Sequence, residues 1–551
     1  MRTFRKSLVT VGVALAATLS TTSVALAESA SGSGATFPQQ FLASATAEFN
    51  KATGHNVTYA NPGGGSSKGK ADFKGGLTDF GGTDSAVTSS QAASFDWTYV
   101  PYVGGAIAIA YRLDELQGAT LSLSANTINA IFAGQITNWA DANIVRDMKA
   151  NPTWANSKKK SDYKGASVQL TPTGPFAVTA TVSLLPSALK GAKGKKVEFI
   201  DNKAKKTIAT ATVASKGEIA VNAKTQDGVE YSVKLDGKEI GKFKRVEVTM
   251  PSKSITVVYR SDGSGTTNNF CNFLKNGTNP DWAVNDAFTS CIPGGSAQVA
   301  SFGSRYQGQS GSANVSNYIA DNSGSIGYTE VSFVTDAARA AKGMKAALVR
   351  NAAGRYVAPT AAAASASIGG ADIDAKGFVT FNYKQTTNTA AYPITAVTYG
   401  LGKLAKSSKN DVVREFFTWI LETYSPTSAE GLGYAPLSGE MKTKALALVK
   451  TISGQRPGPF HFLISFRLSR RSRFLPAGIA RTLRQGRRQS ARMPPCDGHI
   501  LLRASSRSAR FADLHRQLRR GVPPNAESLR TSSRVTWVRR GRVRDGEGVQ
   551  L

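Results

Sequence analysis

The 551-residue chain has few of the residues on which metal sites and histidine-dependent catalysis rely. It contains 3 Cys and 4 His, and only His55 of the histidines precedes residue 455. Neither residue type shows the close spacing of a set of metal ligands. No run beyond the N-terminus reaches the roughly 18 apolar residues that a membrane span requires. The sequence therefore predicts no metal site, no resident cofactor and no enzyme that depends on a catalytic histidine.

Lysine is missing from the C-terminal part of the chain. Residues 455–551 hold 22 Arg, no Lys and 5 acidic residues, which accounts for +17 of the net charge of +31. Residues 158–251 add 18 basic and 9 acidic residues, so the remaining body is nearly neutral. The net charge thus gives no support to a nucleic-acid partner. We predict that residues 455–551 are disordered or arise from translation in the wrong frame; a basic interaction arm is the alternative.

Residues 1–27 have the features of an export signal. Three basic residues lie within the first six, residues 8–19 are apolar, and Ala25-Leu26-Ala27 matches the small-residue pattern of a cleavage site. We expect a mature protein that begins at Glu28 and lies in the periplasm or on the extracellular cell surface. No Cys lies near the cleavage point, so we do not expect a lipid anchor.

The body reads as an α/β fold with a β-rich insertion. In residues 28–157 and 252–454, short apolar runs alternate with helical patterns. Residues 158–251 instead show short alternating segments separated by turn pairs such as Asp236-Gly237. We expect an antiparallel β-sandwich there, with strands at 167–170, 177–183, 196–200, 208–213, 218–221, 231–235 and 245–249. The runs at 197–202 and 208–213 resemble bacterial immunoglobulin-like repeats of surface proteins.

Two of the three cysteines lie in the body. Cys271 and Cys291 are twenty residues apart, whereas Cys496 lies in the arginine-rich tail. Because an exported protein meets an oxidising compartment, we expect a Cys271–Cys291 disulfide. Two free, buried thiols are the alternative.

Four segments rich in Gly, Ser and Thr lie where α/β lobes present loops to a cleft. One such loop alone is usually just a turn, but four together suggest a binding site. They are 32–38 (GSGATFP), 63–68 (GGGSSK), 79–85 (DFGGTDS) and 260–267 (RSDGSGTT).

The fourth segment has the chemistry of an oxyanion site. It joins a predicted strand to a predicted helix, so backbone N–H groups point outward at the positive end of the helix dipole. The hydroxyls of Ser264 and Thr266 lie beside them, and Arg260 can hold an oxyanion with two parallel hydrogen bonds. Asp262 can hold the guanidinium in place. This set suits a small tetrahedral anion.

Asp84 indicates which anion. A carboxylate in an anion site is repulsive unless the ligand brings a proton to share. Phosphate carries one or two protons near neutral pH and sulfate carries none, so a buried Asp84 selects phosphate and rejects sulfate.

The four segments resemble those of the periplasmic phosphate-specific transport receptors, in the same order. Further matches are 136–141 (ITNWAD), 324–330 (GSIGYTE), 392–394 (YPI) and 433–437 (GYAPL). The resemblance implies a type II periplasmic-binding fold: lobe I and the start of lobe II in 28–157, the rest in 252–454. It also implies phosphate contacts from Thr36, Phe37, Ser66, Asp84, Arg260, Ser264, Gly265 and Thr266, with Asp262 in support.

The resemblance further implies a receptor that binds inorganic phosphate and delivers it to the membrane permease of an ABC importer. We expect a monomer that performs no chemistry. The insertion at 158–251 has no counterpart in the family pattern. Its positive charge suits an acidic cell-wall polymer or lipid headgroups, or would concentrate phosphate nearby; a solvated lysine-rich surface is the alternative. The main alternative is a surface adhesin that uses the insertion. A phosphatase and a receptor for sulfate are disfavoured, the first for lack of a nucleophile with a base or metal and the second by Asp84.

Overall fold

The computed structural model describes residues 27–116 and 119–454. Apart from Ala27, the predicted export signal lies outside the described residues, and so does the whole arginine-rich tail.

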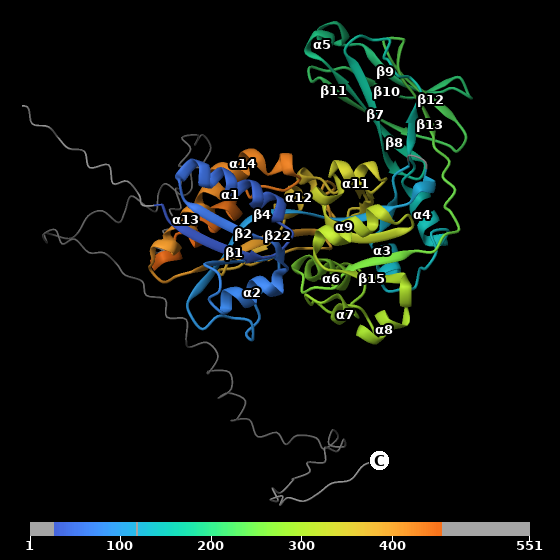
Figure 1. The fold of residues 1–551 in the computed structure, drawn as a ribbon. Helices are drawn as coiled ribbons and strands as arrows, with labels where there is room; N and C mark the ends of the chain where they lie inside the picture. Colours follow the sequence, from blue (N-terminus) through green and yellow to red (C-terminus); the bar gives the residue numbers. More distant parts are fainter. Residues whose placement is uncertain (1–26, 117–118, 455–551) are drawn as a thin grey trace, which may run out of the picture. The chain divides into compact units, whose positions relative to one another are not determined.

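A nine-stranded mixed sheet runs through both α/β segments in the order β15-β14-β16-β4-β22-β3-β1-β2, with β17 also paired to β4 (Figure 1). The long strand β4 (Trp97–Arg112) changes partners along its length. Its first part pairs antiparallel with β22 as far as Ala106, and from Ile107 onward it pairs antiparallel with β16. We call the β22 side lobe I and the β16 side lobe II. The change of partner on β4 therefore marks a crossing between the lobes.

Lobe I contains four further strands and several helices. Strand β1 pairs in parallel with β2 on one side and with β3 on the other. Strand β22 lies between β3 and β4 and pairs antiparallel with both. The elements are β1 (Ser29–Gly34), α1 (Gln39–Thr53), β2 (Asn56–Gly64), α2 (Ser66–Lys74), β3 (Phe80–Thr83), α12 (Ala361–Ile368), β22 (Thr395–Lys403), α13 (Ser408–Trp419), a π-helix (Ile420–Tyr424), α14 (Ser425–Ser428) and α15 (Gly439–Val449).

Lobe II is built on β14, which pairs in parallel with both β15 and β16. A small sheet, β19-β18-β5, lies beside this core. The elements are β5 (Ser122–Ser124), α3 (Ala125–Phe132), α4 (Ala142–Ala150), β14 (Thr256–Arg260), α6 (Gly265–Gly277), α7 (Phe288–Cys291), α8 (Gly295–Ser301), β15 (Tyr306–Gln309), α9 (Gly311–Asp321), β16 (Ser325–Glu330), α10 (Val331–Val334), α11 (Ala337–Ala341), β17 (Lys345–Ala346), β18 (Leu348–Arg350) and β19 (Tyr356–Val357).

The central strand explains why the two lobes share one core. All residues of β4 between its two ends are buried, which fits its run of small and branched side chains. Buried residues of β4, β14, β16, β22 and the helices on them form one continuous hydrophobic cluster. The two lobes therefore share one core along β4.

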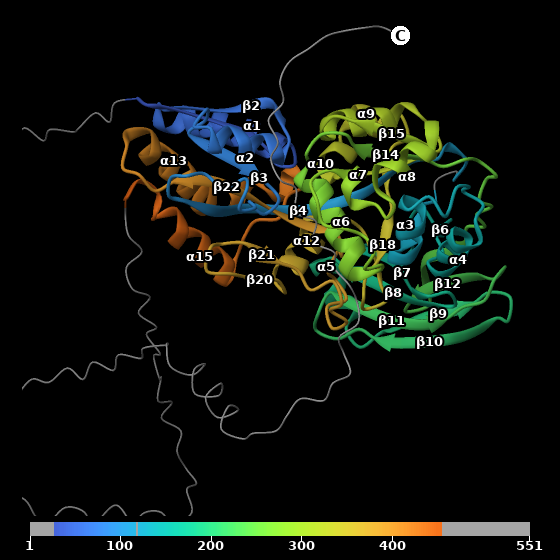
Figure 2. The same cartoon turned by 90° about the horizontal axis from the view of Figure 1, so that it is seen from below.

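The insertion has its own core. Two antiparallel sheets, β10-β9-β12-β13-β6 and β11-β8-β7, enclose a separate cluster of buried apolar residues (Figure 2). The elements are β6 (Trp154–Asn156), β7 (Ala166–Gly174), β8 (Ala177–Leu184), α5 (Pro186–Ala192), β9 (Lys196–Asp201), β10 (Lys206–Thr212), β11 (Glu218–Lys224), β12 (Glu230–Leu235) and β13 (Lys238–Arg245). The β-rich prediction for this part of the chain is confirmed.

The strand expected at 245–249 is wrong. Asp236 and Gly237 have φ of 51° and 74°, as a two-residue hairpin turn requires, and Leu235 pairs with Lys238 across it. The last strand therefore begins directly after the turn, as β13, and ends at Arg245. The short helix α5 was not expected either; Pro186 stands in its first turn, where proline is well tolerated.

The ends of the insertion lie side by side. Strand β6, just before the predicted boundary at 158, pairs with β13, and the N–H of Val246 donates to the carbonyl of Thr153. Farther out, the N–H of Ile255 donates to the carbonyl of Thr137. Strand β14 thus leaves the insertion close to where the chain entered it.

Candidate functional site

The turn between β14 and α6 leads into a helix N-terminus of the kind that can bind an anion. Ser264 is the N-cap residue, and its hydroxyl accepts a hydrogen bond from the N–H of Thr267 at 3.2 Å. The N–H groups of the first helical residues, Gly265 and Thr266, have no carbonyl four residues earlier in the helix. They are available to an anion, at the positive end of a 13-residue helix.

Arg260 ends β14 with its guanidinium buried. Its side chain is 2% exposed. Nε donates to Asp262 Oδ1 at 2.7 Å, Nη2 donates to Asp262 Oδ2, and Nη1 donates to Ser312 Oγ at 3.0 Å. Burial by itself would raise the pKa of Asp262, but the hydrogen bonds and charge of Arg260 hold that pKa below its usual range. Asp262 therefore fixes the guanidinium plane.

Lobe I brings Ser66 and Asp84 to the same place. Ser66 begins α2, and Asp84 follows the last residue of β3. The Ser66 hydroxyl donates to Asp84 Oδ2 at 3.4 Å and lies 3.1 Å from the Asp84 N–H. The other carboxylate oxygen, Oδ1, is buried and has no hydrogen-bond partner in the described part of the chain.

The Asp84 carboxyl is prepared to hold a proton. Burial is the main cause that raises its pKa to about 7, and the charge of Glu330 raises it further, while Thr398 and Arg260 act in the opposite direction. An unpartnered buried oxygen beside a guanidinium is costly unless a ligand hydrogen bonds to it.

Thr36 and Phe37 complete the lobe I contribution. Thr36 Oγ1 lies 3.0 Å from Ser312 Oγ, the same hydroxyl that Arg260 contacts. The Phe37 carbonyl accepts a hydrogen bond from the Tyr434 hydroxyl at 2.7 Å, and the two rings pack edge to face. These contacts fix the loop at the N-terminal end of α1.

Two lobe II residues that the sequence reasoning did not assign join this cluster. Ser312 lies in the first turn of α9, and Glu330 is the last residue of β16. Glu330 Oε1 accepts from Ser312 Oγ at 2.9 Å and from Thr266 Oγ1 at 3.2 Å. The Gly-Ser pair at 311–312, at a strand-to-helix turn, is the sequence signal that could have indicated Ser312.

The lobes touch at Gly265. A Cβ at this position would lie 2.4 Å from Ser66 Oγ and 2.7 Å from the Asp84 Cβ, so no larger residue fits. The structure therefore links Thr36, Arg260 and Thr266 through Ser312 and Glu330, and it brings Ser66 and Asp84 against Gly265. The other two residues of the predicted anion site, Phe37 and Ser264, adjoin Thr36 and Gly265 in the chain. The predicted Asp262 lies directly behind Arg260.

A second contact between the lobes lies next to this site. Lys70 on α2, which is 2% exposed, donates to Asp286 Oδ2 at 2.8 Å and to Ser85 Oγ at 3.0 Å. Asp286 Oδ2 also accepts from Ser67 Oγ at 2.9 Å, and the Asp286 carbonyl accepts from the N–H of Ser264 at 2.8 Å. We call the Lys70–Asp286 ion pair the interlobe pair.

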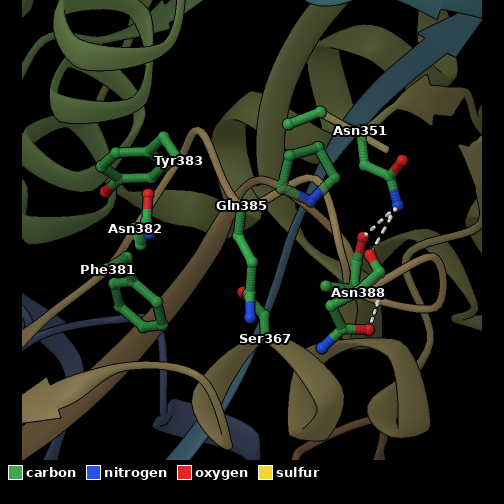
Figure 3. A pocket seen from close by; sticks show the side chains of 10 residues that line it. Asn351, Ser367, Phe381, Asn382, Tyr383, Gln385 and Asn388 are labelled. Atoms are coloured by element: carbon green, nitrogen blue, oxygen red, sulfur yellow. Dashed lines mark hydrogen bonds between the residues drawn. The ribbon is translucent and has the colours of Figure 1, made fainter. Parts of the chain in front are cut away.

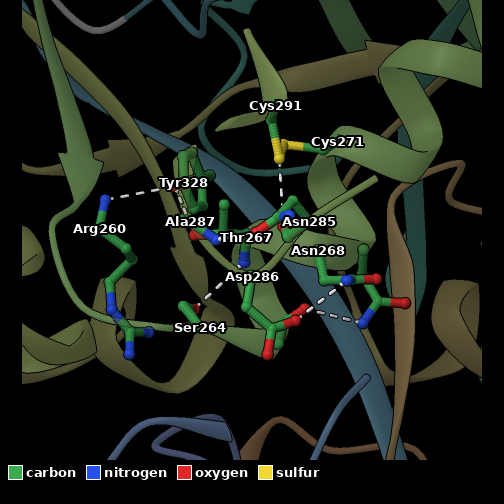
Figure 4. The surroundings of a disulfide bond; sticks show 12 residues. Arg260, Ser264, Thr267, Asn268, Cys271, Asn285, Asp286, Ala287, Cys291 and Tyr328 are labelled. Carbon is green, nitrogen blue, oxygen red and sulfur yellow. Dashed lines mark hydrogen bonds between the residues drawn. A yellow bond between two sulfur atoms is a disulfide. The ribbon is translucent and has the colours of Figure 1, made fainter. Parts of the chain in front are cut away.

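A disulfide supports the segment that carries Asp286. Cys271 on α6 and Cys291 at the end of α7 are bonded, with a Cα–Cα distance of 6.1 Å (Figure 4). In the same view Asn268 donates to Asp286 Oδ1 at 3.0 Å. The disulfide thus closes the loop that connects α6 to the interlobe pair.

A different pocket lies between the segment 381–393 and the residues around Asn351 (Figure 3). Its lining is uncharged and mixes polar with apolar side chains, and Asn351 Nδ2 already donates to the carbonyls of Thr389 and Ala391 at 3.1 and 3.0 Å. Its cavity of about 20 Å³ holds roughly one water molecule. It is therefore not a site for an anionic ligand.

The described residues show neither a metal centre nor a membrane span. Across 27–116 and 119–454, no group of three His, Cys, Asp or Glu side chains is placed to hold a metal ion. Within the same ranges, no helix has both the length and the apolar character to cross a bilayer.

Comparison with known proteins assigns the family. The chain matches the PBP superfamily domain over residues 19–245 and 219–423. The chain belongs to the PBP superfamily. Its mixed α/β lobes agree with the two-lobed fold expected of that superfamily.

Several curated relatives of this PBP superfamily member are phosphate-binding proteins. It is 25% identical over 414 residues to the phosphate-binding protein PstS of Xylella fastidiosa, covering 74% of this chain and 81% of the relative. It is 24% identical over 440 residues to the PstS of Haemophilus influenzae, covering 79% and 96%. A solved periplasmic phosphate-binding protein, PfluDING, is 19% identical with a TM-score of 0.46, covering 76% of this chain and 93% of that one.

Proposed function

We propose that this PBP superfamily member binds inorganic phosphate between its lobes and delivers it, without chemical change, to the permease of an ABC-type phosphate importer. The observation that carries the proposal is the buried Asp84 Oδ1, which has no partner among the described residues and lies in one cluster with Arg260. A protonated tetrahedral anion fits both: its P–O–H donates to Asp84, and its other oxygens accept from Arg260 and the N-terminus of α6. The names of the curated relatives support the same ligand.

Each residue of the site has a proposed role. Arg260 clamps the anion, Ser264, Gly265 and Thr266 present the helix N-terminus, and Asp84 accepts the ligand proton. Thr36, Phe37 and Ser66 close the site from lobe I through N–H groups and hydroxyls. The described part of the site holds neither a histidine nor a cluster of metal ligands, and we propose a receptor and not an enzyme.

The test is calorimetric titration of the purified, phosphate-free protein with phosphate and then sulfate at pH 7. We expect phosphate to bind with micromolar affinity or tighter, and sulfate to give no heat of binding. Equal affinity for both anions would contradict the role of Asp84. No binding of either anion would overturn the receptor function.

Other features of the biology are proposals as well. We propose that the domain division is 28–157, 158–251 and 252–454, that the protein is an exported monomer, and that the insertion contacts an acidic cell-wall polymer. The last rests on exposed lysines of the insertion, namely Lys203, Lys205, Lys206, Lys216 and Lys224. Co-sedimentation of the protein with purified anionic wall polymer, weakened when these lysines are changed to Gln, tests the polymer contact.

A further inference from the structure

Glu330 is a second buried acid at the proposed site, and phosphate binding as proposed above does not use it. It is 2% exposed and ends β16, at the point where lobe II faces lobe I. Both of its oxygens accept hydrogen bonds: Oε1 from Ser312 and Thr266, and Oε2 from the Thr329 hydroxyl at 3.1 Å. Glu330 is therefore one hydroxyl away from Arg260 and from Thr36.

The charges around Glu330 do not compensate it. The titratable groups that act on it are Arg260 from β14, Asp84 after β3 and Tyr434 from the segment before α15. Arg260 is the one cation of this group, and two of its nitrogens are already bound to Asp262. With Asp84 and Glu330 both ionised, the site would carry a surplus of negative charge before any anion entered.

A phosphate that enters this space adds one or two further negative charges. Uncompensated charge in a buried site is expensive, and the least costly response is for one acid to take a proton. Asp84 already shares a proton with the ligand in the proposed mode of binding. Glu330 is the remaining acid without a cationic partner of its own, and burial raises its pKa while Arg260 lowers it only in part.

Protonation of Glu330 also redirects the hydroxyls. Ionised Glu330 can only accept, so it takes the hydrogens of Ser312 and Thr266. Protonated at Oε1, it donates to Ser312 Oγ, whose hydrogen then turns to Thr36 Oγ1, 3.0 Å away. Thr36 and Thr266 are thereby free to donate their hydrogens to the ligand.

We infer that Glu330 takes up a proton from solvent when phosphate binds, and that this proton switches the Ser312–Thr36 and Thr266 hydroxyls from Glu330 toward the ligand. The inference rests on the proposed phosphate function. No covalent bond changes other than the O–H formed at Glu330, and the proton returns to solvent when phosphate leaves. Phosphate affinity then gains a dependence of up to about tenfold per pH unit, weakening as pH rises, beyond that caused by the ligand and Asp84.

The experiment counts protons. Phosphate is titrated calorimetrically at one pH in two buffers of different ionisation heat, which gives the protons taken up per phosphate bound. We expect wild type to take up about one proton more than Glu330→Gln. Because the charge of Glu330 acts on Asp84, the comparison is repeated without a titrating Asp84: Asp84→Asn should take up about one proton more than Asp84→Asn combined with Glu330→Gln. Asp84→Asn is the matched control, since it keeps the share of Glu330. Equal proton numbers in wild type and Glu330→Gln would overturn the inference.

A second measurement does not depend on the folding of Glu330→Gln. In Asp84→Asn, the infrared carbonyl band of a newly protonated carboxylic acid is followed as inorganic phosphate is added at saturating concentration. We expect the band to appear, and its absence from the saturated protein would overturn the inference. A wild-type protein that binds no phosphate would instead overturn the proposed function, and this inference with it.

Discussion

Asp84 and Glu330 are two buried acids near Arg260. The charge of Arg260 is already paired with a third acid, Asp262. The three acids behave differently because their surroundings differ. Asp262 receives two hydrogen bonds from Arg260 and its pKa falls, whereas the pKa of Asp84 and of Glu330 is raised by burial. One arginine thus supports one ionised carboxylate and leaves two that are ready to hold protons.

Asp84→Asn tests the selection between anions. The amide is close in shape but uncharged, so the repulsion that excludes sulfate is removed and the charged acceptor for the phosphate proton is lost. We expect phosphate affinity to fall roughly tenfold to a hundredfold, in line with about 1.5–3 kcal/mol for a hydrogen bond to a charged group, and sulfate binding to become measurable by calorimetry. An Asn variant that still rejects sulfate would show that exclusion has another cause.

The pH dependence of phosphate binding has a defined sign. Above the raised pKa of Asp84, about 7, the free carboxyl is ionised and phosphate keeps one proton to share with it; below that pH the carboxyl and the ligand hold a second proton between them, and the site carries less negative charge. We expect the affinity of the wild type to decrease as pH rises above 7, and the dependence to become shallower in Asp84→Asn. Titrations at pH 6, 7, 8 and 9 in a sulfate-free buffer measure it.

Arg260→Lys separates charge from geometry. Lysine keeps the positive charge but cannot bind Asp262, Ser312 and an anion from one planar group. We expect phosphate affinity to fall by about a hundredfold or more. Lys403→Arg, an exchange of the same two residue types far from the site, is the control and leaves phosphate affinity unchanged; equal affinity of Arg260→Lys and wild type would contradict the clamp.

At the scale of elements, the N-termini of α2 and α6 meet across the lobes. Ser67 on α2 donates its N–H to the carbonyl of Gly263, just before α6, and the interlobe pair joins Lys70 of α2 to the segment that follows α6. Closing the lobes and completing the anion site are therefore one event. Ligands that bind between hinged lobes are released only when such contacts open.

Lys70→Met tests the interlobe pair. The apolar side chain cannot hold Asp286, so the closed form loses a buried ion pair that no atom of the ligand touches. We expect phosphate to dissociate about ten times faster or more, with little change in the association rate, as measured by stopped-flow fluorescence. Lys68→Met is the matched control, because Lys68 lies on the same helix but is 52% exposed and pairs with Asp72 inside lobe I.

The disulfide acts on stability. Removing it with Cys271→Ser and Cys291→Ser opens a loop of twenty residues, for which chain entropy predicts a loss of roughly 3 kcal/mol. Relative to the oxidised wild type, we expect a lower midpoint of urea unfolding both for the reduced wild type and for the double variant. An unchanged midpoint would show that packing alone holds α6 and α7 together.

The same scale shows what the sequence could and could not predict. The segment 260–267 predicts a strand end, a turn and a helix start, together with the residues proposed to contact the anion. It could do so because all of these features are local in the sequence. Glu330 was not predicted because its role depends on where β16 meets α6 and α9, which no local pattern contains. Ser312 carries a local signal in the Gly-Ser pair at 311–312, but that signal does not show that α9 meets Arg260. The strand expected at 245–249 was wrong for a different reason. The turn at Asp236 was identified, but the prediction missed that the next strand, β13, begins directly after that turn.

At the scale of the whole molecule, the insertion has a hydrophobic core of its own, and its two ends are hydrogen bonded to each other. Its buried apolar residues form their own cluster, while β6 and Val246 hold its two ends together. Residues of the proposed phosphate site lie outside 154–245. A part with its own core and adjacent ends is expected to be dispensable for the fold that carries it.

Replacing residues 154–245 by a short Gly-Ser linker tests this independence. We expect the shortened protein to fold and to bind phosphate with an affinity within about threefold of the wild type, as measured by calorimetry. Loss of phosphate binding with an intact circular dichroism spectrum would show that the insertion contributes to the lobes after all.

The adjoining ends of the insertion also define a socket. Any compact domain whose own termini lie close together could be inserted between Thr153 and Val246. It would be attached to lobe II, close along the chain to β14, which ends at Arg260. A fluorescent reporter placed there would follow lobe closure, which would turn the receptor into a phosphate sensor. Such an exchange would leave every residue of the proposed phosphate site in place.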